Sequence, residues 1–235
     1  MKVLVLNGSP HTERGVHVTM LQHLEEGLRE AGAEVARRDV YRLDINPCLG
    51  CFSCWRQTPG KCVQDDDMQS LLPEVAQSDM LVLATPVYVD GMTGPMKTLL
   101  DRLVPLLRGR FEVREDHCRH PLREGVKAGR LVLVSASGFT EMDNFDPLVA
   151  HIKAACKNMG REFAGAILRP YGWFLGHLRR RGLPVDSILY AIRSAGVHLV
   201  EEGSIPEEVL DEISRDLVAR EEVVEYLNSY YGQFE

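Results

Sequence analysis

The feature that most constrains the fold is a regular alternation between short apolar runs and amphipathic segments. The apolar runs predict five strands, at Lys2–Leu6, Glu34–Tyr41, Met80–Ala84, Leu131–Ser135 and Glu162–Leu168. The segments with apolar residues three and four apart predict helices at Val16–Ala31, Gln69–Gln77, Met96–Leu107, Pro147–Met159, Pro184–Val200 and Pro206–Leu227. This alternation favours the α/β class. It predicts a doubly wound five-stranded parallel sheet, order 2-1-3-4-5, with helices on both faces.

The 235 residues fit one large domain, because the sequence contains no internal repeat and no linker rich in Gly, Ser or Pro. We therefore expect a single domain over residues 1–235. The stretch 108–130 has no clear period and is expected to form an irregular excursion from the sheet. A C-terminal helical extension is expected near residues 184–229.

Composition excludes several classes of function. The net charge of −7 arises mainly from acidic residues after residue 200, so it indicates a solvated final helix rather than a cationic substrate. Positive charge is dispersed among acids, which argues against a nucleic-acid partner. No apolar run approaches the roughly 20 residues that span a bilayer, and no export signal is evident. We expect a cytoplasmic protein without a membrane partner, whose thiols are kept reduced.

The loop after the first strand predicts a phosphate site. In a doubly wound sheet, ligands bind beyond the carboxyl ends of the strands. Residues 8–15 contain glycine, a serine hydroxyl and polar side chains, and they lead directly into a helix N-terminus. The loop is neither a dinucleotide G-x-G-x-x-G nor a P-loop, so a mononucleotide phosphate fits best. An ordinary turn between strand and helix is the alternative interpretation.

Two further loops follow buried strands at the same predicted sheet edge. Residues 85–94 include Tyr88, and residues 136–140 include Phe139. Small residues with one aromatic in each loop suit the face and edge of a flat heterocycle. For Tyr88 alone, packing against the neighbouring helix is an equally simple interpretation.

Four cysteines form the strongest local motif, Cys48-x₂-Cys51-x₂-Cys54-x₇-Cys62. Four thiolates in one loop suit an iron–sulfur cluster or tetrahedral zinc. The consecutive x₂ spacings are similar to the start of a bacterial [4Fe–4S] motif, although the fourth cysteine follows seven residues later instead of three. Reduced thiols without metal, or a labile disulfide, remain alternatives.

Several motifs together resemble one known family. They are Asn7-Gly8-Ser9-Pro10, Pro47-Cys48-x₂-Cys51-x₂-Cys54 with Gly60-Lys61-Cys62, Asp66-Asp67-Met68, Ala84-Thr85-Pro86-Val87-Tyr88, and Gly94-Pro95-Met96-Lys97-x₃-Asp101-Arg102. Over residues 1–170 the chain resembles the flavodoxin-like NAD(P)H-dependent FMN reductases, specifically their iron–sulfur flavoprotein branch. This resemblance implies the flavodoxin-like version of the predicted sheet.

The resemblance also implies cofactors and their ligands. FMN would place its phosphate on Ser9, His11, Gly15, Val16 and His17, and its ring on Pro86, Val87, Tyr88, Val89, Asp90, Ser137 and Gly138. A [4Fe–4S] cluster would be bound by Cys48, Cys51, Cys54 and Cys62. A homodimer or homotetramer is implied. The family usually has arginine at position 11 and Ser or Thr at position 17, so the two histidines here make phosphate binding depend on pH.

The implied function is an FMN-dependent oxidoreductase that takes electrons from NAD(P)H or a reduced ferredoxin-like protein, with the cluster passing electrons singly. The alternative is a flavodoxin-type electron carrier without its own small-molecule substrate. No side chain stands out as a general acid or base, so we predict no catalytic residue. His117, Cys118 and His120, in the excursion, form either a metal-binding trio or a solvated segment.

Overall fold

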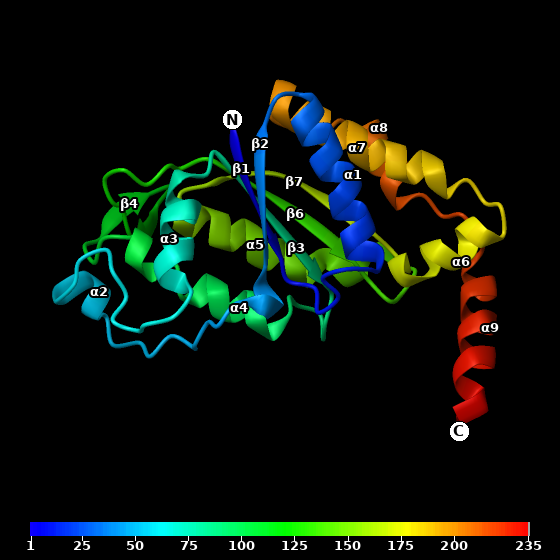
Figure 1. Cartoon of the computed structure of the whole chain (residues 1–235), viewed down its shortest axis with the longest axis horizontal. Helices are drawn as coiled ribbons and strands as arrows, with labels where there is room; N and C mark the ends of the chain where they lie inside the picture. The colour runs from blue at the N-terminus through cyan, green and yellow to red at the C-terminus, as the bar shows by residue number, and fades with distance from the viewer. Residues whose placement is uncertain (235) are drawn as a thin grey trace.

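The computed structural model describes residues 1–234 and contains a five-stranded parallel sheet (Figure 1). Its strands are β1 (Lys2–Asn7), β2 (Glu34–Asp39), β3 (Met80–Pro86), β6 (Arg130–Ala136) and β7 (Glu162–Arg169). They lie in the order β2-β1-β3-β6-β7. The predicted doubly wound sheet of order 2-1-3-4-5 is therefore confirmed, with β6 and β7 as its fourth and fifth strands.

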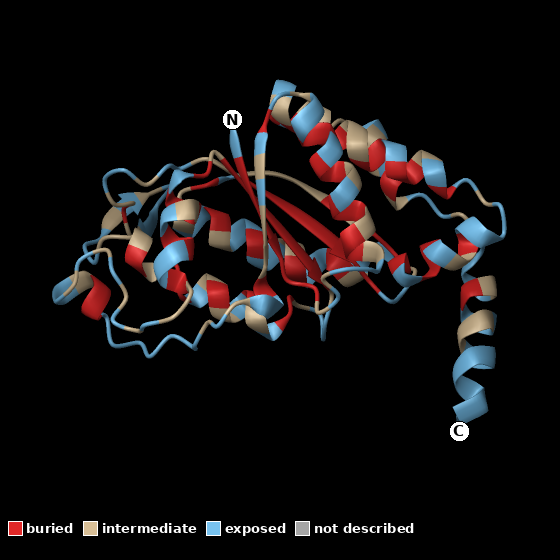
Figure 2. Ribbon diagram, in the orientation of Figure 1, coloured by how far each residue is buried: buried red, intermediate tan, exposed pale blue. Residues whose placement is uncertain are grey.

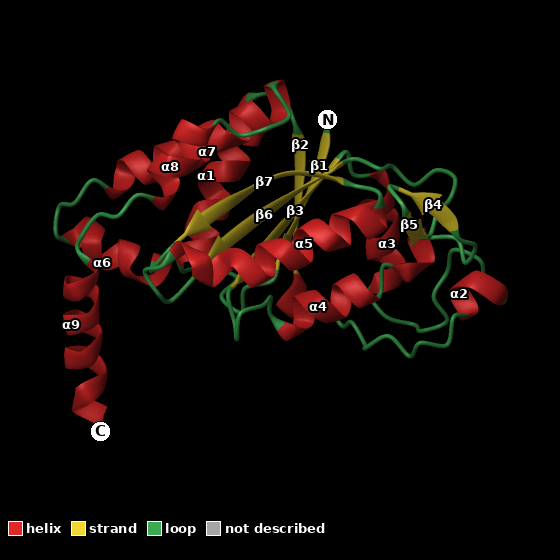
Figure 3. Ribbon diagram, turned by 180° about the vertical axis from the view of Figure 1, so that it is seen from behind, coloured by secondary structure: helices red, strands yellow, loops and turns green. Residues whose placement is uncertain are grey.

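Helices cover both faces of the sheet (Figure 3). Their bounds are α1 (Val16–Glu30), α2 (Ser53–Arg56), α3 (Met68–Gln77), α4 (Gly94–Asp101), α5 (Asp146–Met159), α6 (Leu175–Arg180), α7 (Val185–Glu201), α8 (Glu207–Ser214) and α9 (Arg220–Tyr231). Side chains alternate across a strand, so Val3 and Val5 of β1 face α1 and α7, whereas Leu4 and Leu6 face α3 and α4. Figure 2 shows that the central strands β1, β3 and β6 are almost wholly buried, whereas the edge strands β2 and β7 are partly exposed.

Helices α1 and α7 cross at a pair of glycines. A Cβ atom on Gly27 would lie 1.9 Å from the carbonyl oxygen of Arg193, and one on Gly196 would lie 2.5 Å from that of Leu24. The two backbones therefore touch directly at the crossing. This contact leaves no room for any side chain at either position.

The prediction of one helix over Met96–Leu107 is wrong at its C-terminal end. Helix α4 ends at Asp101, and a short 3₁₀ turn follows at Val104–Leu106. Pro105 explains the early end, because its ring would clash with the carbonyl group four residues earlier and it has no N–H to donate.

The prediction of one helix over Pro206–Leu227 is also wrong, because α8 and α9 are separate helices. The buried Arg169, at the end of β7, donates from Nη1 to the carbonyl oxygens of Ile213 (2.9 Å) and Arg215 (2.8 Å). The Tyr171 hydroxyl accepts a hydrogen bond from the Leu217 N–H at 2.9 Å. These contacts fix the chain between the helices in an extended path, and α9 then leaves the body of the molecule (Figure 1).

Residues 108–130 contain a small two-stranded antiparallel hairpin that is separate from the main sheet. Its strands are β4 (Glu112–Arg114) and β5 (His117–Arg119), joined by Glu115 and Asp116 with φ of 52° and 57°. The hairpin lies at the same end of the molecule as the cysteine loop (Figure 1). Among residues 1–234, the structure contains no helix both long and apolar enough to span a membrane.

Candidate functional site

The loops after β1, β3 and β6 are tied together at the carboxyl edge of the sheet. The Gly8 N–H donates to the Ala84 carbonyl at 2.7 Å, and the Thr93 hydroxyl donates to the Gly8 carbonyl at 2.8 Å. The Val87 N–H donates to the Ala136 carbonyl at 3.1 Å. This edge therefore holds the predicted loops as one connected surface at the topological switch point.

The predicted phosphate loop leads into a helix end that lacks a side-chain cap. The buried Ser9 hydroxyl accepts a hydrogen bond from the His11 N–H at 3.3 Å, which curls the loop. Gly15 has φ of +104°, a conformation that favours glycine, and α1 begins at the next residue. No side chain within residues 1–234 caps α1, so its first N–H groups and its positive dipole end suit an anion.

His17, in the first turn of α1, carries a buried polar atom without a partner. The residue is 5% exposed, and its Nε2 atom makes no hydrogen bond within the described residues. Burial lowers the pKa of His17 to about 4, although a hydrogen bond with the Thr85 backbone opposes this. At neutral pH the ring is uncharged. A neutral ring carries one N–H, and the hydrogen bond with Thr85 uses it, so Nε2 would donate to a phosphate oxygen only once the ring gains a second proton.

This burial makes stability depend on pH. In the unfolded chain His17 has its ordinary pKa of 6.5, above its folded pKa of about 4, so between these values the unfolded state binds more protons. We expect His17 to remove about 2–3 kcal/mol of stability as the pH falls from 7.5 to 4.5. Urea unfolding at both pH values checks this against His17→Asn, which lacks the titrating ring. Equal pH dependence in both proteins would contradict the prediction.

The predicted ring-binding loop after β3 ends in a tight turn. The N–H and carbonyl groups of Tyr88 and Gly91 exchange two hydrogen bonds, of 2.9 and 3.1 Å. Between them, Val89 and Asp90 have φ of 47° and 61°. A positive φ is strained for a β-branched residue, and such strain clusters at ligand sites. Val89 is 99% and Tyr88 49% exposed, so Tyr88 is not buried against a neighbouring helix.

The loop after β6 lies beside this turn. Ser137 is buried, and its hydroxyl donates to the Phe139 carbonyl at 2.9 Å. The Gly138 carbonyl accepts a hydrogen bond from Trp173 Nε1 at 3.0 Å. Phe139 itself is 68% exposed. Both predicted ring-binding loops therefore present apolar surface to solvent.

The four clustered cysteines line one cavity. Its volume is about 370 Å³, and Cys48, Cys51, Cys54 and Cys62 all contribute to its wall. All six cysteines are free thiols. Within residues 1–234, no three His, Cys, Asp or Glu side chains are arranged to hold a single metal ion. A cubane binds its thiolates at separate corners, so its ligands lie farther apart than those of one ion.

The cysteines of this cavity interact electrostatically. Burial raises the pKa of the Cys54 thiol, and the nearby Cys62, Cys51 and Cys48 raise it further. Hydrogen bonds from the side chain and backbone of Ser53 lower the pKa of Cys51. Bringing four thiolates together therefore costs free energy unless a cation compensates their charge.

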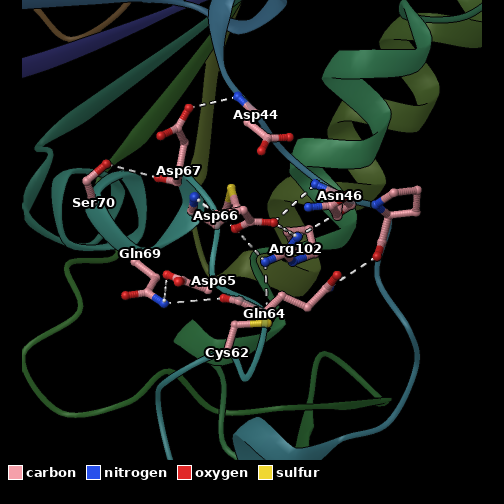
Figure 4. Close-up of polar contacts among 12 residues, drawn as sticks. Asp44, Asn46, Cys62, Gln64, Asp65, Asp66, Asp67, Gln69, Ser70 and Arg102 are labelled. Carbon is pink, nitrogen blue, oxygen red and sulfur yellow. Dashed lines mark hydrogen bonds and ion pairs between the residues drawn. The ribbon is translucent and has the colours of Figure 1, made fainter.

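Arg102 supplies a buried cation beside this cavity (Figure 4). Its side chain is 1% exposed and forms a two-bond ion pair with Asp66, at 2.5 and 2.9 Å. Its Nη2 atom also donates to Cys62 Sγ at 3.4 Å, and Nη1 donates to the Asn46 carbonyl at 2.5 Å. Burial would raise the pKa of Asp66, but hydrogen bonds from Arg102, Asn46 and Met68 outweigh it and lower the pKa.

Sequence reasoning did not identify Arg102 and Asp66 as site residues, although both stand in motifs used for the family resemblance. A detectable signal was present, because Arg102 lies between Leu99 and Leu103 on the apolar side of its segment. A charged residue at a core position needs a buried partner.

Residues of the segment 108–123 pack against the cysteine loop and form a hydrogen bond with it. Trp55, in α2, stacks on Phe52 at 4.9 Å and lies 4.6 Å from the ring of His120. Arg123 Nη2 donates to the Cys54 carbonyl at 2.8 Å. In the described chain, His120 is thus part of an aromatic contact, and it is not assembled with other ligands around a metal ion.

Comparisons with known proteins agree with this geometry. A family model described as NADPH-dependent FMN reductase matches residues 1–136. An iron-sulfur flavoprotein of Methanocaldococcus jannaschii is 32% identical over 137 residues, covering 58% of this chain and 63% of that protein. One of Archaeoglobus fulgidus is 33% identical over 141 residues, covering 60% and 58%. The chain thus matches about three-fifths of the length of these curated relatives.

Solved structures show the same flavodoxin-like fold. An NAD(P)H:quinone oxidoreductase from Methanothermobacter marburgensis superposes with a TM-score of 0.62 at 18% identity, covering 85% of this chain and 96% of that one. An FMN-dependent NADH-azoreductase from Bacillus anthracis, in complex with FMN, has a TM-score of 0.60 at 17% identity, with coverages of 85% and 99%. At these identities the likeness establishes the fold alone.

Proposed function

The chain belongs to the NADPH-dependent FMN reductase family, and we propose that it is an FMN-dependent oxidoreductase that takes electrons from NAD(P)H. The observation that carries the proposal is the buried, unpartnered Nε2 atom of His17 beside the uncapped N-terminus of α1. A buried polar atom without a partner costs about 1–3 kcal/mol, and a phosphate oxygen that accepts from Nε2 of a protonated ring would remove that cost.

The residues present fit FMN. The N–H groups of residues 15–17 and the Ser9 hydroxyl bind its phosphate, together with His11 and His17. The backbone of residues 86–90 and of Ser137–Gly138 flanks its ring and excludes water from one side. Bound FMN supplies the ability to accept a hydride or two single electrons.

We propose further that Cys48, Cys51, Cys54 and Cys62 bind a [4Fe–4S] cluster. Support comes from their common cavity and from relatives that are named iron-sulfur flavoproteins. Arg102 stabilises the bound thiolate of Cys62 through its hydrogen bond and its charge. A reduced ferredoxin-like protein is a second electron donor that such a one-electron site would accept. Reduced thiols in this role favour a cytoplasmic location.

The flavodoxin-type carrier is the second candidate function. The observation that favours it is the exposed turn of the predicted ring-binding loop after β3, where Val89 is 99% exposed and accessible to a protein partner. A carrier would exchange electrons with proteins and would not react with a nicotinamide.

Anaerobically purified protein tests the proposal directly. We expect a yellow or brown protein with one FMN per chain, iron and sulfide, whose flavin absorbance bleaches on addition of NADPH or NADH. A colourless preparation that does not take up added FMN would contradict the flavin proposal. Bleaching by reduced ferredoxin but by neither nucleotide would favour the carrier. An iron content near zero would contradict the cluster proposal but not the flavin proposal.

Cys54→Ser tests the cluster separately from the flavin. We expect this variant to contain about 10-fold less iron than the wild type, because it removes a ligand, and to keep its FMN. Cys156→Ser is the matched control, since Cys156 is buried on α5 and does not line the cavity. Iron and flavin are measured per chain in all three proteins. Full iron in Cys54→Ser would contradict the ligand assignment.

A further inference from the structure

We propose that residues 220–234, here called the C-terminal arm, dock on the carboxyl edge of the sheet in a second copy of this chain. The arm consists of α9 and the turn that follows it. Figures 1 and 3 show α9 projecting from the body on the side where the strands β1, β3 and β6 end. In both views its far end lies away from the rest of the described chain.

The root of the arm is held firmly in one direction. Val223 is 2% exposed, and the Tyr226 ring lies 4.8 Å from Phe174 and 4.5 Å from His177. Arg181 and Glu222 form an ion pair across this junction. Because the beginning of α9 is packed against the body of the molecule, the arm is not free to fold back onto its own chain.

The tip of the arm has the composition of an interface. Tyr230, Tyr231 and Phe234 are 48%, 59% and 72% exposed. The sequence from residue 226 to residue 234 contains no charged residue, although 26% of the chain is charged. Aromatic enrichment with loss of charge marks the buried centre of protein interfaces. A helix as short as α9 is marginal in water alone, so its last turns need a partner.

A complementary surface lies on the same side of the chain. Exposed apolar residues follow β3, β6 and β7 in turn: Tyr88 and Val89, then Phe139 and Met142, then Trp173. Because these strands are neighbours, the residues follow one another along one edge of the sheet, and we call this row the stripe. Its last member, Trp173, stacks on Tyr226 at the root of the arm, with 6.1 Å between the ring centroids. The exposed aromatics of stripe and tip amount to about 700 Å² per protomer, near the ~800 Å² per partner of a stable interface.

The occupant that fits both surfaces is another copy. One chain carries both the tip and the stripe, so a two-fold axis between two copies would seat each tip on the partner's stripe. The acidic residues Glu221, Glu222 and Glu225 would repel an anionic lipid surface or a nucleic acid, so they argue against either as the partner of the arm. Where the stripe borders the ring-binding loops the inference rests on the proposed function. There, the partner's tip would cover the exposed turn at Tyr88 and Val89.

Light scattering after size exclusion tests the docking. We expect the wild type to have the mass of a dimer, or of a larger even oligomer, and the triple variant Tyr230→Ser, Tyr231→Ser, Phe234→Ser to have half that mass or less. The matched control is Tyr190→Ser, since Tyr190 is 72% exposed on α7, outside both surfaces. A triple variant with wild-type mass, or a monomeric wild type, would overturn the proposal.

Hydrogen exchange provides the second measurement, because it reports on the arm itself. We expect amides of residues 227–234 to exchange more slowly as the wild-type concentration is raised, and at a constant fast rate in the triple variant. Exchange that does not change with concentration would count against docking. FMN content is measured on the same samples. A monomer with bound FMN would contradict the docking of the arm but not the proposed function. An oligomer with a protected arm but no FMN would contradict the proposed function but not the docking.

Discussion

An Arg102→Met variant is expected to lose about 3–5 kcal/mol of unfolding free energy, because it leaves the Asp66 carboxylate buried without a counterion. The Asn46 carbonyl and the Cys62 sulfur lose a donor at the same time. Methionine keeps most of the side-chain volume, so the loss reports on charge and hydrogen bonding more than on packing. Urea unfolding at pH 7 measures the difference.

A double variant tests whether the unpaired charge of Asp66 is the cause of this loss of stability. In Asp66→Asn/Arg102→Met neither buried group is ionised. The Asn46 and Met68 N–H groups bind different oxygens of Asp66, so the single amide oxygen introduced at position 66 can accept from only one of them. We expect the double variant to recover part of the stability lost in Arg102→Met. Arg102→Met within about 1 kcal/mol of the wild type would contradict the structural role of the pair. We also expect less iron in the single variant, since Cys62 loses its cationic neighbour.

A Gly27→Ala substitution is expected to cost about 3 kcal/mol or more, although alanine is the better helix former. Its Cβ atom would lie 1.9 Å from the Arg193 carbonyl oxygen, so α1 and α7 must separate along their contact. The expected overpacking cost exceeds the gain of about 1 kcal/mol from helix propensity. The midpoint of urea unfolding, compared at one pH, gives the sign and size of the effect.

Gly176→Ala is the matched control for this prediction. Gly176 also lies inside a helix, α6, and its nearest neighbour to a new Cβ is the flexible end of Arg180 at 3.8 Å. This substitution is expected to be neutral or to stabilise the protein by up to about 1 kcal/mol. If both glycine variants were stabilised alike, the close crossing of α1 and α7 would be incorrect.

The sheet could be predicted from the sequence because its central strands β1, β3 and β6 are buried on both faces. Runs such as Lys2–Leu6 and Met80–Ala84 are then continuously apolar, and right-handed crossovers limit the possible strand orders. The loops that approach the carboxyl edge followed from that order. Nothing beyond the positions of the strands was needed to bring residues 8–17, 85–94 and 136–140 together.

The errors arose where a distant residue determines local structure. Periodicity continues through residues 215–219, but the buried Arg169 and Tyr171 take the backbone groups there and end α8. The Asp66–Arg102 pair likewise joins residues 36 positions apart, and the local sequence around either residue does not identify its partner. The pKa of His17 depends on burial, which a motif does not reveal. The loop and the four cysteines were found from sequence, whereas their electrostatics required the fold.

The crossing of α1 and α7 also has a consequence for how the protein is made. Glu30 and Arg193, which form an ion pair across this crossing, are 163 residues apart in the chain. Translation at about 5–20 residues per second therefore leaves the side of α1 around Gly27 without its α7 partner for roughly 10–30 seconds. During that interval this side of α1 is open to chaperones and to neighbouring nascent chains. The close crossing of the two helices is thus completed late in synthesis.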